Sequence, residues 1–399
     1  MSRRVALTVA MLVALVTVGT LSLSAYGEGG RGGGDEEENE SARGGSTRNG
    51  QIAFRRYLDP EQTKDAIFKM NPDGSHVSQI THPPKGWRDE SPVWSPDGGK
   101  VAFFRQRFDE SMSRIMLVDL KSGDTREVTH CGPNKGQPKQ APPGRCASDF
   151  DPAWAPDGDS LAFRRILTPE KSCCIIEGIW IVRSDGSNPH QVTNVEPERM
   201  ERLEAEDAPK LPQTFSDYGS AFSPNGKMLV FDRVWRGQEA PKLVRLGEEE
   251  PYYHAVFVQS LDSSGKPEDA RQITPWKMNC QDHPEYSPDA KLVLFRCLPE
   301  GEEGPSNLYW VHPDGTGLHQ ITHSPKSDGQ YYLGSSFSPT FSEEEGWITA
   351  GRQPGYGEDD NADVYRLQIK DGEVVRSVNL TKSAIWDSGP VWGSHPPVG

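Results

Sequence analysis

One short pattern recurs along this chain and constrains its fold more than any other feature. A small residue, a proline and an apolar residue precede an aromatic residue, a tight turn follows, and the chain continues into an apolar strand, as in "SPVWSPDGGKVAFF" at residues 91–104. The aromatic residue returns every 51 to 68 positions. Self-similarity at a period of this size indicates a repeat architecture. The six copies are centred on Trp94, Trp154, Phe222, Tyr286, Phe337 and Trp392.

Each copy belongs to a unit of four short strands. The turn reads Ser-Pro-Asp-Gly at residues 95–98 and recurs in altered form at 155–158, 223–226, 287–290 and 338–341. After it come an apolar strand, a gap of variable length, an alternating strand, a second glycine turn and a last strand that ends in threonine, as in "IFKMNPDGSHVSQIT". Four strands per unit and six units predict an all-β fold, a six-bladed β-propeller of four-stranded antiparallel blades.

The two ends of the repeat region complement each other. The segment "DSGPVWG" at residues 387–393 has the pattern of an innermost strand without its neighbour, and "GQIAFRR" at residues 50–56 has that of a second strand without an innermost one. Pairing the C-terminal strand with this N-terminal strand completes the first blade and leaves no open sheet edge there. We therefore expect the propeller to occupy residues 50–394, with a C-terminal tail at 395–399.

Composition and charge agree with a fold of short strands and narrow the choice of partners. The chain has 40 glycines and 33 prolines, nearly a fifth of its residues, and an apolar fraction of 34%. This balance favours strands and turns over long helices. The net charge of -15 opposes nonspecific binding to nucleic acid or to anionic lipid. We expect no nucleic-acid partner, and basic or cationic partners suit the chain better.

The first 49 residues differ from the repeat region. Ser2-Arg3-Arg4 precedes an apolar run at residues 5–25, and small residues stand where a leader is cleaved, so residues 1–27 predict an export signal. The run is long enough to span a bilayer, so an uncleaved anchor is the alternative and the one expected membrane contact. Residues 28–49, which are mostly glycine and charged residues, predict a disordered linker. We expect an exported protein: secreted, periplasmic or at the cell surface.

The six cysteines suit an oxidising compartment. Cys280 and Cys297 lie almost equidistant from the turn at residues 288–289, which places them opposite each other on a hairpin and within disulfide reach. Cys131 and Cys146 flank one loop rich in proline and glycine. The adjacent Cys173 and Cys174 either close a strained ring, stay free or pair elsewhere, and the sequence leaves these alternatives open.

The repeat resembles that of a known family. An aromatic residue before Ser-Pro-Asp-Gly, an apolar strand, an Asp-Gly turn and a closing Ile-Thr or Val-Thr are similar to the repeat of the TolB-type propellers, which are related to the propeller domains of prolyl-oligopeptidase-like proteins. The resemblance covers residues 50–394. It implies a six-bladed propeller that works in the bacterial cell envelope with a peptidoglycan-associated lipoprotein. TolB also carries a separate N-terminal domain, where this chain has the linker at 28–49.

Insertions are expected on one face of the propeller. The turns after the first and third strand of each unit are short, and all the length variation falls in the other two loop classes, which leave an up-and-down blade on the same face. Binding residues gather on such loops because a rigid scaffold supports them. Aromatic residues expected there are candidate partner contacts, although strand packing could equally bury them: Trp87, Trp235, Tyr331, Tyr332 and Trp386.

Aspartates stand near the start of the innermost strand in five units. They lie four or five residues before the repeat aromatic: Asp89, Asp149, Asp217, Asp282 and Asp387. We call them the ring aspartates. Around the mouth of an axial channel they would offer hard oxygen ligands to Ca²⁺, with His283 beside them. Alternatively, each carboxylate accepts backbone N–H bonds from the turn that opens its own strand, an interpretation that the regular recurrence favours.

Catalytic signatures are missing from the sequence. It contains no Gly-x-Ser-x-Gly elbow, zinc-protease motif, P-loop or dinucleotide fingerprint in a suitable context. An active site built from loops leaves no linear motif, so the absence favours a nonenzymatic protein without deciding the matter. The first hypothesis is a monomeric propeller that binds an envelope protein or a cell-wall ligand through its loop-rich face. The alternative is a metal-assisted lyase or hydrolase acting on a carbohydrate or lactone at the axial channel mouth, and a scaffold without a ligand is a third.

Overall fold

The computed structural model describes most of the repeat region. It covers residues 50–60, 62–110, 112–130, 145–168, 176–193, 214–236, 252–262, 269–298, 306–324, 330–353 and 361–393. The expected leader, linker and C-terminal tail lie outside the described residues. None of the helices in the described segments has the length and hydropathy needed to cross a membrane.

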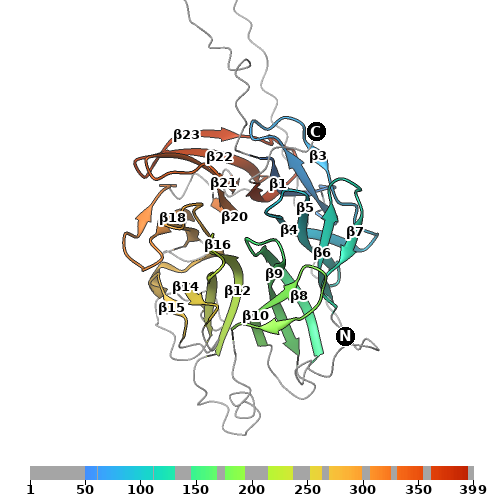
Figure 1. The fold of residues 1–399 in the computed structure, drawn as a ribbon. Helices are drawn as coiled ribbons and strands as arrows, with labels where there is room; N and C mark the ends of the chain where they lie inside the picture. Colours follow the sequence, from blue (N-terminus) through green and yellow to red (C-terminus); the bar gives the residue numbers. More distant parts are fainter. Residues whose placement is uncertain are drawn as a thin grey trace, which may run out of the picture. The chain divides into compact units, whose positions relative to one another are not determined.

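Six four-stranded antiparallel sheets form the predicted propeller, and Figure 1 shows them following one another around a ring. Three sheets, each from the innermost strand outward, are β24 (Asp387–Trp392), β1 (Ile52–Tyr57), β2 (Asp65–Met70), β3 (Ser78–Gln79); β4 (Trp87–Trp94), β5 (Lys100–Arg107), β6 (Ser113–Asp119), β7 (Thr125–Glu127); and β8 (Arg145–Trp154), β9 (Ser160–Thr168), β10 (Ile176–Arg183), β11 (His190–Gln191). The other three are β12 (Thr214–Phe222), β13 (Met228–Arg236), β14 (Tyr252–Ser260), β15 (Arg271–Gln272); β16 (Cys280–Tyr286), β17 (Val293–Cys297), β18 (Asn307–Val311), β19 (His319–Gln320); and β20 (Gln330–Phe337), β21 (Glu345–Gln353), β22 (Asp363–Lys370), β23 (Glu373–Asn379).

The Ser-Pro-Asp-Gly turn is held by its own side chains. The Ser95 hydroxyl donates to Asp97 Oδ1 at 2.6 Å and accepts from the Lys100 amide at 2.9 Å, while Asp97 Oδ1 also accepts from the Gly99 amide at 3.0 Å. Gly98 has a φ of 68°, which glycine adopts without steric cost. Equivalent bonds recur at Ser223 with Asn225. The motif therefore recurs because it fixes where β4 turns into β5 and its counterparts.

The threonine that ends each unit also has a repeated role. In every sheet its hydroxyl accepts a hydrogen bond from a backbone amide of the third strand, as Thr81 Oγ1 does from the Ile67 amide at 3.0 Å. The outermost strands are short, so this bond ties the end of each unit to its own sheet. The six threonines are Thr81, Thr129, Thr193, Thr274, Thr322 and Thr381.

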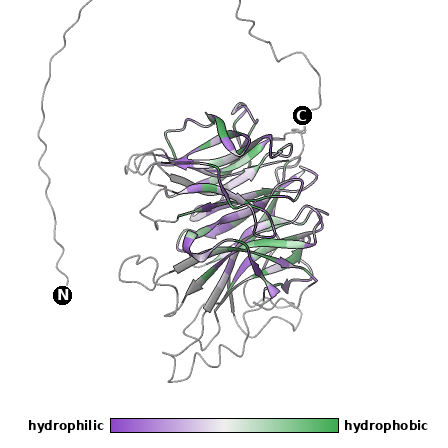
Figure 2. Cartoon of the chain, turned by 90° about the vertical axis from the view of Figure 1, so that its left-hand side faces the viewer, coloured by the Kyte–Doolittle hydropathy of each residue, from purple (hydrophilic) through white to green (hydrophobic). Residues whose placement is uncertain are grey.

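The hydrophobic core lies between neighbouring sheets. One cluster joins Phe104 of β5 to Trp154 of β8 and Phe163 of β9, and another joins Leu294 of β17 to Phe337 of β20 and Ile348 of β21. Hydrophobic stretches run along the strands of the blades in Figure 2. Because each cluster draws on two sheets, a blade buries its apolar faces only beside its neighbours. The largest fully buried side chains include a phenylalanine from the second strand of five sheets: Phe54, Phe103, Phe163, Phe231 and Phe295.

The ring closes as the chain ends predicted. β24 pairs with β1, with Ile52 opposite Trp392 and Arg56 opposite Asp387. The Trp392 indole donates to the Gly50 carbonyl at 3.1 Å, and the Arg56 guanidinium donates to both Asp387 oxygens at 2.7 Å. The first blade is thus assembled from both ends of the repeat region, and the prediction of closure is confirmed.

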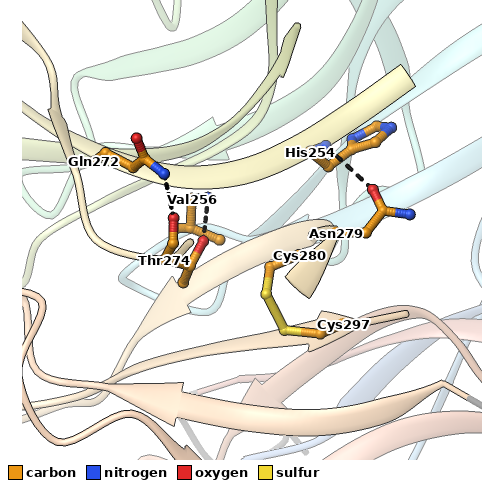
Figure 3. The surroundings of a disulfide bond; sticks show 7 residues. All are labelled: His254, Val256, Gln272, Thr274, Asn279, Cys280 and Cys297. Atoms are coloured by element: carbon orange, nitrogen blue, oxygen red, sulfur yellow. Dashed lines mark hydrogen bonds between the residues drawn. A yellow bond between two sulfur atoms is a disulfide. The ribbon is translucent and has the colours of Figure 1, made fainter. Parts of the chain in front are cut away.

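Cys280 and Cys297 form a disulfide between β16 and β17 (Figure 3). They face each other in the register of the two strands, as the hairpin spacing predicted, and both are buried. Cys131, Cys173 and Cys174 lie outside the described residues, as does the side chain of Cys146, and their pairing stays a prediction.

Removing the disulfide is expected to destabilise the propeller by about 3 kcal/mol, the loss of loop-closure entropy for a cross-link of this length. The cysteines are 17 residues apart. The measurement is the urea unfolding midpoint of Cys280→Ala, Cys297→Ala and the double variant. Since either substitution breaks the bond, the second should add little to the first. Two small and additive effects would contradict the prediction.

Candidate functional site

The innermost strands share a β-bulge at the same height. The register of β4 against β5 shifts between Glu90 and Val93, and equivalent shifts occur in the other five sheets. Residues at these shifts have a positive φ: Ser91, Asp151, Gly219, His283 and Gly389. Bulges re-aim side chains, and a non-glycine residue in this conformation stores strain of order 1–3 kcal/mol, a feature that clusters at functional sites. Three blades have a polar residue at this position, although glycine would adopt the same conformation without strain.

An axial pocket of about 290 Å³ extends from these bulges toward the Ser-Pro-Asp-Gly turns. Residues of β4, β8, β12, β16, β20 and β24, the innermost strands of the six sheets, line it. Of the described residues that line it, four can titrate: Asp151, His283, Glu285 and Tyr286. Its aromatic walls are residues of the repeat itself: Trp94, Trp154, Phe222, Tyr286 and Trp392.

Asp151 and His283 meet at the bulge end of the pocket although they come from sheets two apart. His283 Nε2 lies 3.2 Å from Asp151 Oδ1. Gly219 of the intervening β12 permits this approach, because a Cβ there would lie 3.1 Å from the His283 amide nitrogen. Arg164 lies 3.8 Å from the other Asp151 oxygen and stacks over Tyr218 at 4.7 Å.

A second histidine–aspartate pair lies beside the first. His254 Nδ1 is 3.1 Å from both oxygens of Asp232. Burial raises the pKa of Asp232, and the neighbouring His254 opposes that rise. Asp282, which pairs with Arg296, acts on the same carboxyl. We call this group the polar cluster: Asp151, Arg164, Tyr218, Asp232, His254, Asp282, His283 and Arg296.

The structure places each ring aspartate against an arginine of the next strand. Asp89 is fully buried and accepts from Arg105 at 2.6 and 2.8 Å. None of the five lines the axial pocket. A bidentate arginine compensates a buried carboxylate well, so these pairs have a structural role in the blade. The pairs are Asp89–Arg105, Asp149–Arg165, Asp217–Arg233, Asp282–Arg296 and Asp387–Arg56.

Metal binding is one interpretation of the ring aspartates. Within the described segments, no group of three or more His, Cys, Asp or Glu residues is arranged to hold a metal ion. The calcium site, and the metal-assisted lyase or hydrolase that would use it, stay predictions. Of the candidate face aromatics, Trp87 and Trp386 are half-buried, at the start of β4 and just before β24. Trp235, Tyr331 and Tyr332 lie in β13 and β20, but their side chains lie outside the described residues.

The sequence singled out His283, which lines the pocket, and Asp282 beside it, and missed Asp151 and Glu285, which line the pocket too. A signal for the arginine pairs was present, because Asp89, Asp149 and Asp217 each precede their arginine by 16 residues. No such signal marked Asp151 or Glu285, which reach the pocket through bulges that sequence patterns do not show.

Comparison with known proteins gives short sequence matches. No family model matches the chain. It is 37% identical over 59 residues to the Tol-Pal system protein TolB of Zymomonas mobilis, which covers 15% of this chain and 12% of that protein. It is 34% identical over 87 residues to the TolB of Rhizorhabdus wittichii, covering 22% and 16%. The matches therefore span less than a fifth of the length of these relatives.

Solved structures with the same fold match most of the chain. TolB from Acinetobacter baumannii superposes with a TM-score of 0.54 at 16% identity, over 87% of this chain and 67% of that one. Kuenenia stuttgartiensis hydrazine synthase gives 0.55 at 14% identity, over 88% and 47%. Likeness at such identities shows the fold alone. With the short sequence matches, it makes this chain a TolB-like six-bladed propeller.

Proposed function

We propose that this protein is an exported, nonenzymatic propeller that binds an envelope protein at the bulge end of its axial pocket. The axial pocket carries the proposal, because residues of all six innermost strands build it and the polar cluster borders one end. Each innermost strand runs from an interblade loop, through its bulge, to a tight turn. The bulge end is therefore the end nearer to the loop-rich face.

The physical character of the site suits protein recognition. Concave sites with aromatic walls and a few convergent charged groups supply both contact area and orientation. Arginines and aspartates of the polar cluster hold each other in place, so little side-chain entropy is lost when a partner docks. Since the matched relatives are Tol-Pal system proteins, an envelope protein of the Pal type is the first partner to test, and a cell-wall ligand is the second.

Export is part of the proposal. The leader pattern at residues 1–27 supports it, and so does the disulfide between Cys280 and Cys297, because such bonds persist in oxidising compartments. The uncleaved anchor stays the alternative for the N-terminal segment.

Binding of a purified Pal-type envelope protein to matched variants tests the site. Asp151→Asn and His283→Gln should each weaken binding at least tenfold, because both residues border the pocket. Asp185→Asn is the matched control, since Asp185 lies in an exposed turn at the outer edge of its blade and should bind as the unaltered protein does. Unchanged affinity in the two site variants, with loss in the Asp185 variant, would place the partner elsewhere. The measurement is calorimetry at constant salt.

A further inference from the structure

Glu285 of β16 differs from the other carboxylates near the axis. It lines the axial pocket and is partly accessible within it. The Ser336 hydroxyl donates to its Oε1 at 3.3 Å, and the backbone of Phe337 supplies a second hydrogen bond. Within the described residues it forms no ion pair, whereas every ring aspartate is paired with an arginine. Among the residues that the structure describes, the hydrogen bonds to this carboxyl group therefore come from neutral groups.

Ionising a buried carboxyl group costs free energy when no cation lies beside it. Desolvation raises the pKa of Glu285 to about 8, although the two hydrogen bonds oppose the rise. A buried carboxyl is normally either protonated or paired with a positive charge. A cation that entered the pocket would provide the ion pair that the described residues do not supply.

The walls of the pocket suit the rest of a cationic side chain. Trp94, Trp154 and Trp392 line it, and the faces of indole rings attract ammonium and guanidinium groups. Pro92 and Pro152 add apolar surface of the kind that packs against a methylene stem. Ser220 is an independent observation: it lines the pocket, is 8% exposed, and its buried hydroxyl has no hydrogen-bond partner among the described residues.

We infer that the axial pocket accepts a lysine or arginine side chain of a protein partner, with Glu285 as its counter-ion and the tryptophans as its walls. This inference rests on the proposed function and specifies the chemistry of the partner. The net charge of -15 favours the approach of a basic segment. Asp151, at the bulge end of the same pocket, is a second carboxylate that attracts an entering cation.

Uptake of a cation should be coupled to a proton. The titratable groups of the pocket are Asp151 of β8 and His283, Glu285 and Tyr286 of β16, while β4, β12, β20 and β24 contribute serine, proline, glycine and apolar or aromatic residues. Since Glu285 is protonated near neutral pH, an entering cation displaces that proton. Affinity should therefore increase as the pH rises toward 8.

Blocked tripeptides test the inference without a known partner. The probes are acetyl-Gly-Lys-Gly-amide, its arginine analogue and its norleucine analogue, titrated at pH 7 into the full chain by calorimetry in phosphate and in Tris. We expect both cationic peptides to bind at least tenfold more tightly than norleucine and to release most of one proton. Equal binding of the norleucine peptide overturns the inference, because it uses the same walls without the charge.

Substitution at the counter-ion separates this inference from the proposed function. Glu285→Gln keeps the shape of the side chain, should weaken the lysine peptide at least tenfold and should abolish proton release, whereas Glu344→Gln on the exposed surface should do neither. Unchanged lysine binding in the Glu285 variant overturns the inference. If cationic peptides fail to bind while Asp151→Asn still weakens the envelope protein, the inference fails and the proposed function stands. If the cationic peptides bind, but Asp151→Asn and His283→Gln bind the envelope protein with unchanged affinity, the proposed function fails and the inference about the pocket stands.

Discussion

Deletion of residues 387–399 is expected to leave the chain without a cooperatively folded propeller. The deletion removes β24, and with it Trp392, which is 6% exposed and belongs to the core cluster shared by β1 and β22. Losing a buried tryptophan costs about 3–5 kcal/mol, and the deletion also removes the bidentate ion pair between Asp387 and Arg56. A domain is stable by only about 5–15 kcal/mol in total. The bare edge of β1 also becomes available for intermolecular pairing.

Soluble yield and thermal melting followed by circular dichroism measure the effect. Deletion of residues 394–399 alone is the matched control, because it shortens the chain and keeps β24 whole, so its melting temperature should not change. A cooperative melt of the longer deletion at the temperature of the full chain would show that the closing strand is dispensable.

The ring could be predicted because its recurring residues act locally. Ser95 and Asp97 fix a turn within six residues, and Thr81 bonds to Ile67 inside one sheet, so each leaves a mark at constant spacing. Closure could also be predicted, since the two incomplete patterns at the chain ends are complementary. The disulfide followed from the same hairpin geometry.

The site could be predicted only in part, because its geometry depends on register and on distant blades. The positions of the ring aspartates recur, but their arginines lie across a strand pair, and only that register showed that Asp89 pairs with Arg105. Asp151 and His283 are 132 residues apart in the sequence and meet because the bulges of β8 and β16 both contribute residues to the lining of the axial pocket. Glu285, next to a repeat aromatic, had no feature that marked it as a carboxyl without a cation.

Stability of the free propeller is expected to fall as the pH rises from 5 to 9, with Glu285 as a main cause. Its pKa is near 4.5 in the unfolded chain and about 8 in the fold. The folded state therefore holds a proton that the unfolded state has lost, and the stabilisation present below pH 4.5 is lost as the pH rises through 8. At about 1.4 kcal/mol per pKa unit, the full loss is on the order of 5 kcal/mol, of which about 4 kcal/mol falls between pH 5 and pH 9. Urea midpoints at each pH unit measure it.

The contribution of Glu285 is isolated by a difference, because burial also raises the pKa of Asp232 and acts in the same direction. Glu285→Gln keeps every other titrating group, so its stability relative to the unaltered protein should increase steadily from pH 5 to pH 9. The stability of Glu344→Gln should change with pH as that of the unaltered protein does. If the stability of Glu285→Gln followed the same course, the assignment to Glu285 would be contradicted.

A cation in the pocket stabilises the ionised carboxylate, so saturating acetyl-Gly-Lys-Gly-amide should restore at pH 9 part of the stability that ionisation of Glu285 removes. The norleucine peptide, which offers the same stem without the charge, should restore much less.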